Sequence, residues 1–109
     1  MPATFYRIVH ADPPPVADLT SAAALGKLPP DDDPETLRLW DGISVYDTVL
    51  RAMAKSRRYP WLGRFIAGIE IPDEAPVRIE RTTKSRGHYT VWAEPEQLLA
   101  YVAEVLPAG

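Results

Sequence analysis

Apolar and polar residues alternate in several short stretches of this chain, which is the pattern of strands that bury one face in a sheet. The first stretch, residues 4–10, is rich in aromatic and β-branched residues and predicts an opening strand. One face of that strand carries Phe5, Arg7 and Val9, and the other carries Tyr6, Ile8 and His10. The same pattern predicts further strands over residues 64–71, 77–82 and 89–92, with a polar loop over residues 84–88 before the last of them.

The central stretch, residues 42–58, predicts a strand that stops at a capping pair, Asp47 and Thr48, and passes directly into a helix, which Tyr59 and Pro60 end. Ile43 and Val45 share one face of this strand, whereas Ser44 and Tyr46 share the other. A hydroxyl and an aromatic ring therefore leave the strand end beside a helix N-terminus, where free N–H groups favour anions. Such a turn suits a small-molecule site, but on local residues alone an ordinary structural turn is the favoured interpretation.

Capping residues predict two shorter helices in the proline-rich segment that follows the first strand. Asp18 is expected to cap a helix over residues 18–25, which Gly26 closes. Asp33 is expected to cap a second helix over residues 34–40, with Pro34 at its first position.

The last apolar segment, residues 98–105, fits either one face of a helix or a central strand, and its period does not decide between them.

Length and composition narrow the class of protein. A chain of 109 residues with 46% apolar and 25% charged residues is expected to fold as a single domain, residues 1–109. Its net charge of −3 argues against general nucleic-acid binding. It contains no cysteine, no apolar run long enough for a membrane span and no signal-peptide pattern. We therefore expect a cytoplasmic protein that binds neither nucleic acid nor a membrane.

The charges are unevenly distributed along the chain, because residues 51–64 include several basic side chains and no acidic one. Such a patch suits an anionic ligand, such as a phosphate, or the acidic face of a partner. The alternative, favoured by the spacing of Arg51, Lys55 and Arg58, is the solvated face of an amphipathic helix. Arg7 is a cation among apolar neighbours, so it should meet a carboxylate, reach the sheet edge or bind an anion.

The sequence predicts no metal site, since His10 and His88 lie far apart and neither has a carboxylate at a ligand spacing. The polar features that remain are Arg7, Ser44 with Tyr46, His88 and the pair Glu94 and Glu96. For the two glutamates, the alternative to a site is a charged first turn of a helix, where acids are stabilised by the helix dipole.

In this order, these features resemble the ADP-ribosyltransferase fold, especially its small bacterial members such as the rifamycin-modifying transferases and the RES-domain toxins. The segments that carry the resemblance are a strand with a central cation (5–7), the strand-to-helix unit (42–48), a return strand (63–72) and a carboxylate before a closing strand (94–99). The resemblance implies an α+β fold, with a small mixed or mostly antiparallel sheet and a few short helices packed on it. It also favours a strand over residues 98–105.

The resemblance further implies that NAD is bound as substrate, without a metal, and that its nicotinamide–ribosyl bond is cleaved. ADP-ribose would then pass to a protein acceptor or to water. Arg7 would hold a ribose or phosphate, Ser44 would match the second-strand serine, and Glu96 would bond a ribose hydroxyl and stabilise the cationic transition state. The residues expected to bind the cofactor are Tyr46, Tyr6 and His88.

The alternative is a non-catalytic interaction domain, such as one member of a toxin–antitoxin pair or a subunit of a complex. Proline-rich loops, the separated charges and three tryptophans, Trp40, Trp61 and Trp92, favour it. The two hypotheses differ in geometry, because the enzyme requires its three catalytic residues to line one cleft and the interaction domain requires an exposed tryptophan patch.

Overall fold

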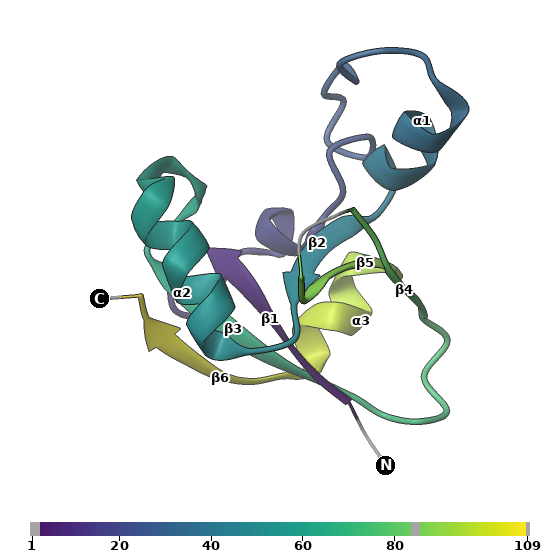
Figure 1. Cartoon of the computed structure of the whole chain (residues 1–109). Helices are drawn as coiled ribbons and strands as arrows, with labels where there is room; N and C mark the ends of the chain where they lie inside the picture. The colour runs from purple at the N-terminus through teal and green to yellow at the C-terminus, as the bar shows by residue number, and fades with distance from the viewer. Residues whose placement is uncertain (1–2, 84–85, 109) are drawn as a thin grey trace.

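The computed structural model describes residues 3–83 and 86–108, which form one six-stranded sheet with α2 and α3 against it and a lobe that carries α1 (Figure 1). The strands are β1 (Ala3–Val9), β2 (Ile43–Tyr46), β3 (Phe65–Ile71), β4 (Arg78–Arg81), β5 (His88–Trp92) and β6 (Val102–Pro107). The α-helices are α1 (Pro34–Trp40), α2 (Val49–Arg58) and α3 (Pro95–Ala100), and the short 3₁₀ helices are η1 (Val16–Leu19) and η2 (Pro60–Leu62). Within the described residues, no helix has the length and apolar character needed to cross a membrane.

The strands lie in the order β4-β5-β2-β1-β3-β6, and each neighbouring pair is antiparallel. The protein is therefore of the α+β class, with an antiparallel sheet and few helices, as expected. β1 pairs with β3 along its whole length. It pairs with β2 at a single register position, Tyr6 opposite Tyr46, so the junction between the two halves of the sheet is short.

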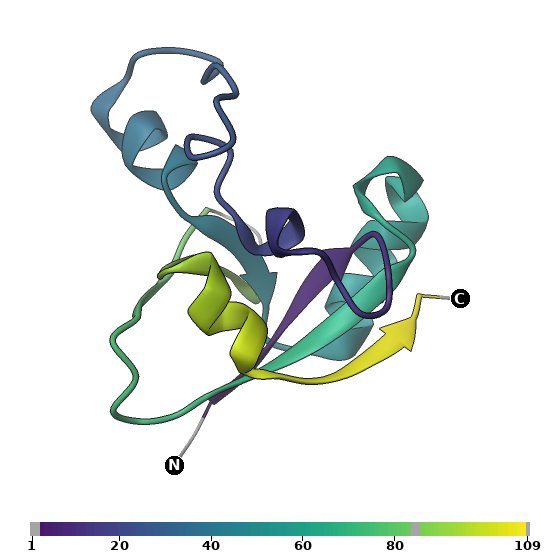
Figure 2. The same ribbon diagram turned by 180° about the vertical axis from the view of Figure 1, so that it is seen from behind.

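An apolar cluster covers each face of the sheet. The cluster beside η1 and α3 contains Phe5, Leu19, Ile43, Val45, Ile69, Ile71, Val91 and Leu98. The cluster beneath α2 contains Ile8, Ala52, Ile66 and Ala108. Figures 1 and 2 show α2 and α3 on opposite faces. The alternation predicted for β1 is confirmed, because Phe5 and Ile8 lie in different clusters.

Most of the predicted elements are confirmed, and their caps form through the expected side chains. At the start of α1, Asp33 Oδ2 accepts a hydrogen bond of 3.1 Å from the backbone N–H of Glu35. At the start of α2, Thr48 Oγ1 accepts one of 3.2 Å from the backbone N–H of Arg51. These caps are local, so they follow from residue types a few positions apart.

The helix expected over residues 18–25 is wrong. The chain forms η1 and then a separate turn that ends at Gly26, where φ is +78°. The Asp18 carboxylate does not cap a helix, because it accepts hydrogen bonds from His10, 2.7 Å from the backbone N–H and 2.8 Å from Nδ1. A tertiary contact therefore uses the side chain that the local pattern assigned to a cap.

The strand favoured over residues 98–105 is wrong for its first part, which belongs to α3. Pro95 occupies the first turn of that helix, and the backbone N–H of Leu98 donates to Glu94. β6 begins only at Val102, which pairs with Ile69. The apolar stretch 98–105 thus contains the end of α3 and the start of β6, so neither a helical nor a strand period fits all of it.

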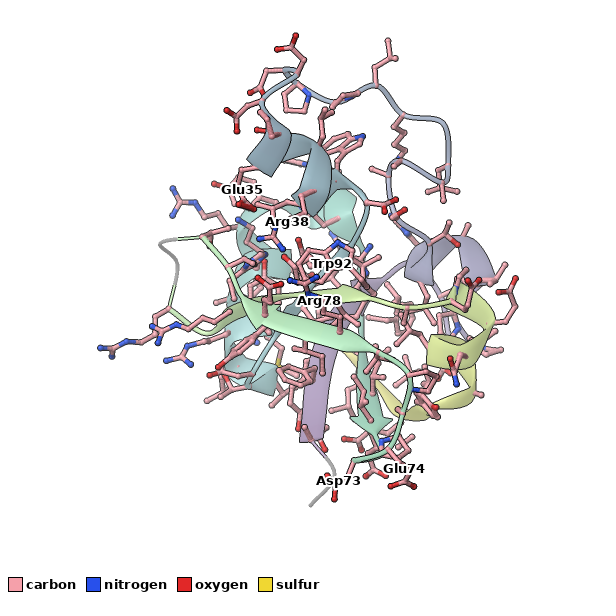
Figure 3. The ribbon with its side chains drawn as sticks, turned by 90° about the vertical axis from the view of Figure 1, so that its right-hand side faces the viewer. Glu35, Arg38, Asp73, Glu74, Arg78 and Trp92 are labelled. Atoms are coloured by element: carbon pink, nitrogen blue, oxygen red, sulfur yellow. The ribbon has the colours of Figure 1, made fainter. Side chains whose placement is uncertain are left out.

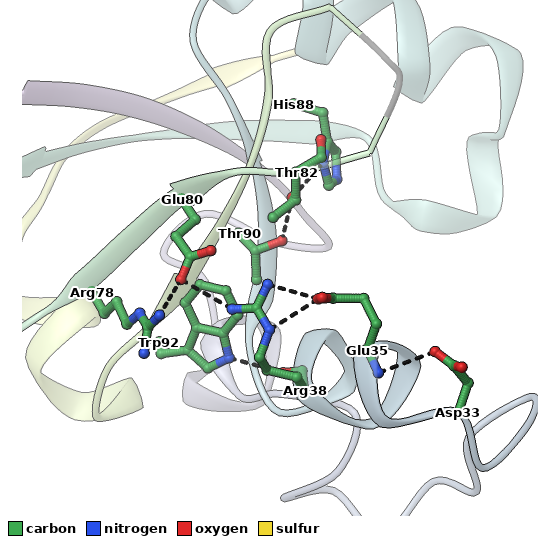
Figure 4. A network of polar contacts seen from close by, with 9 residues as sticks. All are labelled: Asp33, Glu35, Arg38, Arg78, Glu80, Thr82, His88, Thr90 and Trp92. Carbon is green, nitrogen blue, oxygen red and sulfur yellow. Dashed lines mark hydrogen bonds and ion pairs between the residues drawn. The ribbon is translucent and has the colours of Figure 1, made fainter.

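Trp92 joins the lobe that carries α1 to the edge of the sheet (Figures 3 and 4). Its Nε1 donates to the carbonyl oxygen of Arg38 at 2.9 Å, and the guanidinium groups of Arg38 and Arg78 lie 5.0 and 5.6 Å from its ring centroid. Glu80 pairs with both arginines, at 3.0 Å from Arg38 and 2.6 Å from Arg78, and Glu35 pairs with Arg38. Trp92 therefore packs within the fold.

Replacing His10 with alanine is expected to destabilise the protein more in mild acid than in mild base. The hydrogen bond to Asp18 raises the pKa of His10, so this pair stabilises the fold below the unfolded pKa of about 6.5 and is lost as pH rises through the higher folded value. Because His10 is largely exposed, the loss should be about 0.5 kcal/mol. Urea unfolding of His10→Ala and the unaltered protein near pH 5.5 and pH 8.5 measures this loss of stability. Equal losses at the two pH values would contradict the ion pair between His10 and Asp18.

Candidate functional site

A cleft of about 760 Å³ lies between α2 and the strands β1, β2 and β5. Among the residues that the structure describes, the cationic side chains that line it are Arg7, Arg51, Lys55, Arg58 and Arg86. No aspartate or glutamate is among the described residues of its lining. A chain with a formal charge of −3 thus concentrates positive charge in one hollow, which is typical of a site for an anion.

One wall of the cleft is a face of α2. Arg51, Lys55 and Arg58 recur at i, i+4 and i+7, so they lie along the same side of the helix, and this side lines the cleft. These basic residues of α2 therefore form one face of an amphipathic helix, and this same face lines a cleft that suits an anion.

The cations on α2 differ in their pairing. Arg51 Nη1 forms an ion pair of 2.6 Å with Asp47, whereas no described carboxylate lies within ion-pair distance of Lys55 or Arg58. Lys55 Nζ and the guanidinium of Arg58 lie instead near the ring of Tyr59, 4.6 and 5.5 Å from its centroid. Their charges are therefore available to a ligand at the end of the cleft beside Tyr59.

Arg7 reaches the cleft from β1 and bridges the junction with β2. Its Nε donates to the carbonyl oxygen of Asp18 at 3.0 Å, and its Nη1 donates to the carbonyl oxygen of Ser44 at 2.9 Å. Burial lowers the pKa of Arg7, and the nearby charge of Asp18 opposes that shift. Arg7 thus meets backbone carbonyls and the edge of the cleft, and it remains cationic.

Tyr46 and His88 form the wall of the cleft opposite α2. They are register partners on β2 and β5, and their rings meet edge to face with centroids 5.5 Å apart. Burial raises the pKa of Tyr46 and lowers the pKa of His88, and the charge of Lys55 lowers the latter further. Both side chains are therefore neutral near pH 7.

Of the six predicted site residues, the structure brings Arg7, Ser44, Tyr46 and His88 together along this cleft. Glu96 and Tyr6 do not line it. The three residues expected to be catalytic therefore do not share one cleft.

Glu96 is exposed in the first turn of α3, where its charge suits the helix dipole, as the alternative reading of its position proposed. Tyr6 is half-buried against the apolar cluster beneath α2.

Tyr59 and Arg86 are among the lining residues that were not identified as site residues from the sequence. Tyr59 was interpreted only as the end of a helix, and nothing in its local pattern points to a site. Arg86 belongs to a polar loop whose composition was the only available signal. Both reach the cleft through tertiary folding.

Within the part of the chain that the structure describes, no three His, Asp or Glu residues come together in a way that could hold a metal ion. No protein-family model, curated protein or solved structure matches this chain. The chemistry of the cleft itself is therefore the basis for a functional assignment.

Proposed function

We propose that this protein binds NAD, or a closely related phosphate-bearing nucleotide, in the basic cleft. The observation that carries the proposal is the convergence of five cations, counted among the described residues of β1, α2 and the loop before β5, on a hollow without a described carboxylate. Guanidinium and ammonium groups form charge-assisted hydrogen bonds with phosphate oxygens. The two phosphates of NAD would supply the negative charge that this lining lacks.

The remaining lining suits the rest of a nucleotide. Tyr46, Tyr59 and His88 offer flat surfaces to a heterocyclic ring, and Ser44 adds a hydroxyl. A volume of about 760 Å³ lies within the usual range for ligand clefts. Lys55 and Arg58 are one helical turn apart, which puts their side chains within reach of adjacent phosphates.

The resemblance to the ADP-ribosyltransferase fold forms part of this proposal. Arg7, Ser44 and Tyr46, which the resemblance assigns to NAD, line one cleft. Glu96, which it assigns to bond cleavage, lies elsewhere on α3. The proposal therefore concerns binding of the nucleotide, and no cleavage step is assigned to Glu96.

Replacing Arg58 with glutamate is expected to weaken NAD binding at least tenfold, because one charge-assisted contact contributes about 1.5–3 kcal/mol. Isothermal titration with NAD measures the effect. Arg57→Glu is the matched control, since Arg57 is the neighbouring exposed residue of α2, carries the same charge and does not line the cleft. Failure of the unaltered protein to bind NAD, or equal weakening by both variants, would overturn the proposal.

A second candidate is an interaction with the acidic face of a protein partner. Trp61 favours it, because the residue is 71% exposed and its ring meets that of Tyr59 edge to face at the cleft, with ring centroids 5.3 Å apart. Titration with a poly-glutamate peptide separates the two candidates, since Trp61→Ala should weaken peptide binding and leave NAD binding unchanged.

A further inference from the structure

Among the described residues, the ring of His88 is held through one nitrogen, Nδ1, by Thr82 (Figure 4), and the other nitrogen, Nε2, has no hydrogen-bond partner. Nδ1 lies 3.2 Å from the carbonyl oxygen of Thr82 and 3.2 Å from its Oγ1. A carbonyl oxygen only accepts hydrogen bonds, so the contact requires the proton to be on Nδ1.

Two threonines hold this arrangement in place. Thr82 Oγ1 and Thr90 Oγ1 are 2.6 Å apart, and their residues are only 7% and 3% exposed. If Thr82 Oγ1 donates its proton to Thr90, its lone pairs face the N–H of His88. The ring orientation is thus set by buried groups that a ligand does not touch.

With its proton on Nδ1, neutral His88 carries a lone pair on Nε2. No described residue lies within hydrogen-bond distance of Nε2. The cations of the cleft can only donate hydrogen bonds, and its hydroxyl groups can donate or accept. His88 lines the cleft. Its Nε2 differs from the side-chain cations and hydroxyl groups there, because it can accept a hydrogen bond and has none to donate.

We propose that His88 binds a sugar hydroxyl of the ligand through Nε2 and makes the cleft selective for ribose over deoxyribose. The proposal rests on nucleotide binding in this cleft and adds a specificity-determining residue to it. Phosphates cannot satisfy Nε2, because at neutral pH they only accept. A bound ligand without this hydroxyl would shield Nε2 from water and leave it without a hydrogen-bond partner. Leaving a buried acceptor unpaired costs binding free energy, which is how binding sites reject analogues that lack a hydroxyl.

The test compares NAD with its two analogues that lack the 2′-hydroxyl of either the adenosine or the nicotinamide ribose. The unaltered protein should bind NAD at least tenfold more tightly than one of them. In His88→Ala this preference should fall to within twofold, and His88→Gln should restore part of it, because its amide oxygen accepts. Each preference is the ratio of two dissociation constants, for the analogue and for NAD, measured on the same variant. A loss of folding stability affects both constants equally and cancels in the ratio.

The outcomes separate this inference from the proposed function. Equal binding of NAD and both analogues by the unaltered protein would overturn the role of His88 and leave nucleotide binding intact. A preference that persists in His88→Ala would also overturn it. If NAD does not bind at all, both proposals fail. Arg57→Glu, outside the cleft, should keep the full preference.

Discussion

Replacing Gly63 with alanine is expected to lower the free energy of unfolding by about 3 kcal/mol or more. Gly63 lies between η2 and β3 with φ +137° and ψ 161°, a conformation that is essentially restricted to glycine. A Cβ atom at this position would lie 2.7 Å from the carbonyl carbon of Val9 and closer still to its oxygen. Val9 is fully buried at the end of β1, so the backbone cannot move aside cheaply.

Gly26→Ala is the matched control, because Gly26 also has a positive φ, +78°, but a Cβ there would meet nothing within 4 Å. It should cost about 1 kcal/mol from backbone strain alone. Urea unfolding of both variants isolates the contribution of the close approach. Similar losses would show that Gly63 is not held against β1. The close approach of Gly63 to Val9 matters for the site because it fixes η2, which follows Tyr59 and contains Leu62. Tyr59 and Leu62 both line the cleft.

Replacing Arg7 with methionine is expected to lower the free energy of unfolding by about 2–3 kcal/mol and to weaken NAD binding at least tenfold. The substitution keeps an apolar stem but removes the bonds to the carbonyls of Asp18 and Ser44. These bonds join η1 to β2 where β1 and β2 share only one register position. The gain from no longer burying a cation offsets part of the loss.

Arg7→Lys separates the two roles of Arg7. Lysine keeps the positive charge but lacks the planar fork that reaches both carbonyls, so stability should fall while part of the NAD affinity remains. Arg64→Met, at an exposed arginine outside the cleft, should change neither quantity appreciably. Unchanged unfolding of Arg7→Met in urea would contradict its bridging role.

The predicted fold was largely correct where the signals are local. The strands β1 and β3, the caps Asp33 and Thr48 and the end of α2 at Tyr59 follow from residues a few positions apart, although β3 is buried on both faces and not on one. The prediction failed at Asp18, whose carboxylate is bound by His10 across a loop. Local propensity assigns such a side chain to the nearest helix, and only a tertiary contact reassigns it.

The candidate site was predicted in part for the same reason. Alternation correctly put Ser44 and Tyr46 on the same side of β2, and the basic face of α2 was visible from its spacing. The association of Glu96 with this site came from its order in the chain. Order along a chain does not state which elements become neighbours in space, and α3 lies on the face of the sheet opposite α2.

By itself, the sequence determined the strands, the helix that follows β2 and the positive charge of that helix. Only the tertiary structure decided that this charge lines a cleft and that His88 shares it with Tyr46, because β2 and β5 pair in antiparallel register from distant parts of the chain. The physical reason is the range of the interactions. Side-chain direction within an element follows from its own period, whereas strand pairing depends on the burial of both faces of the whole sheet.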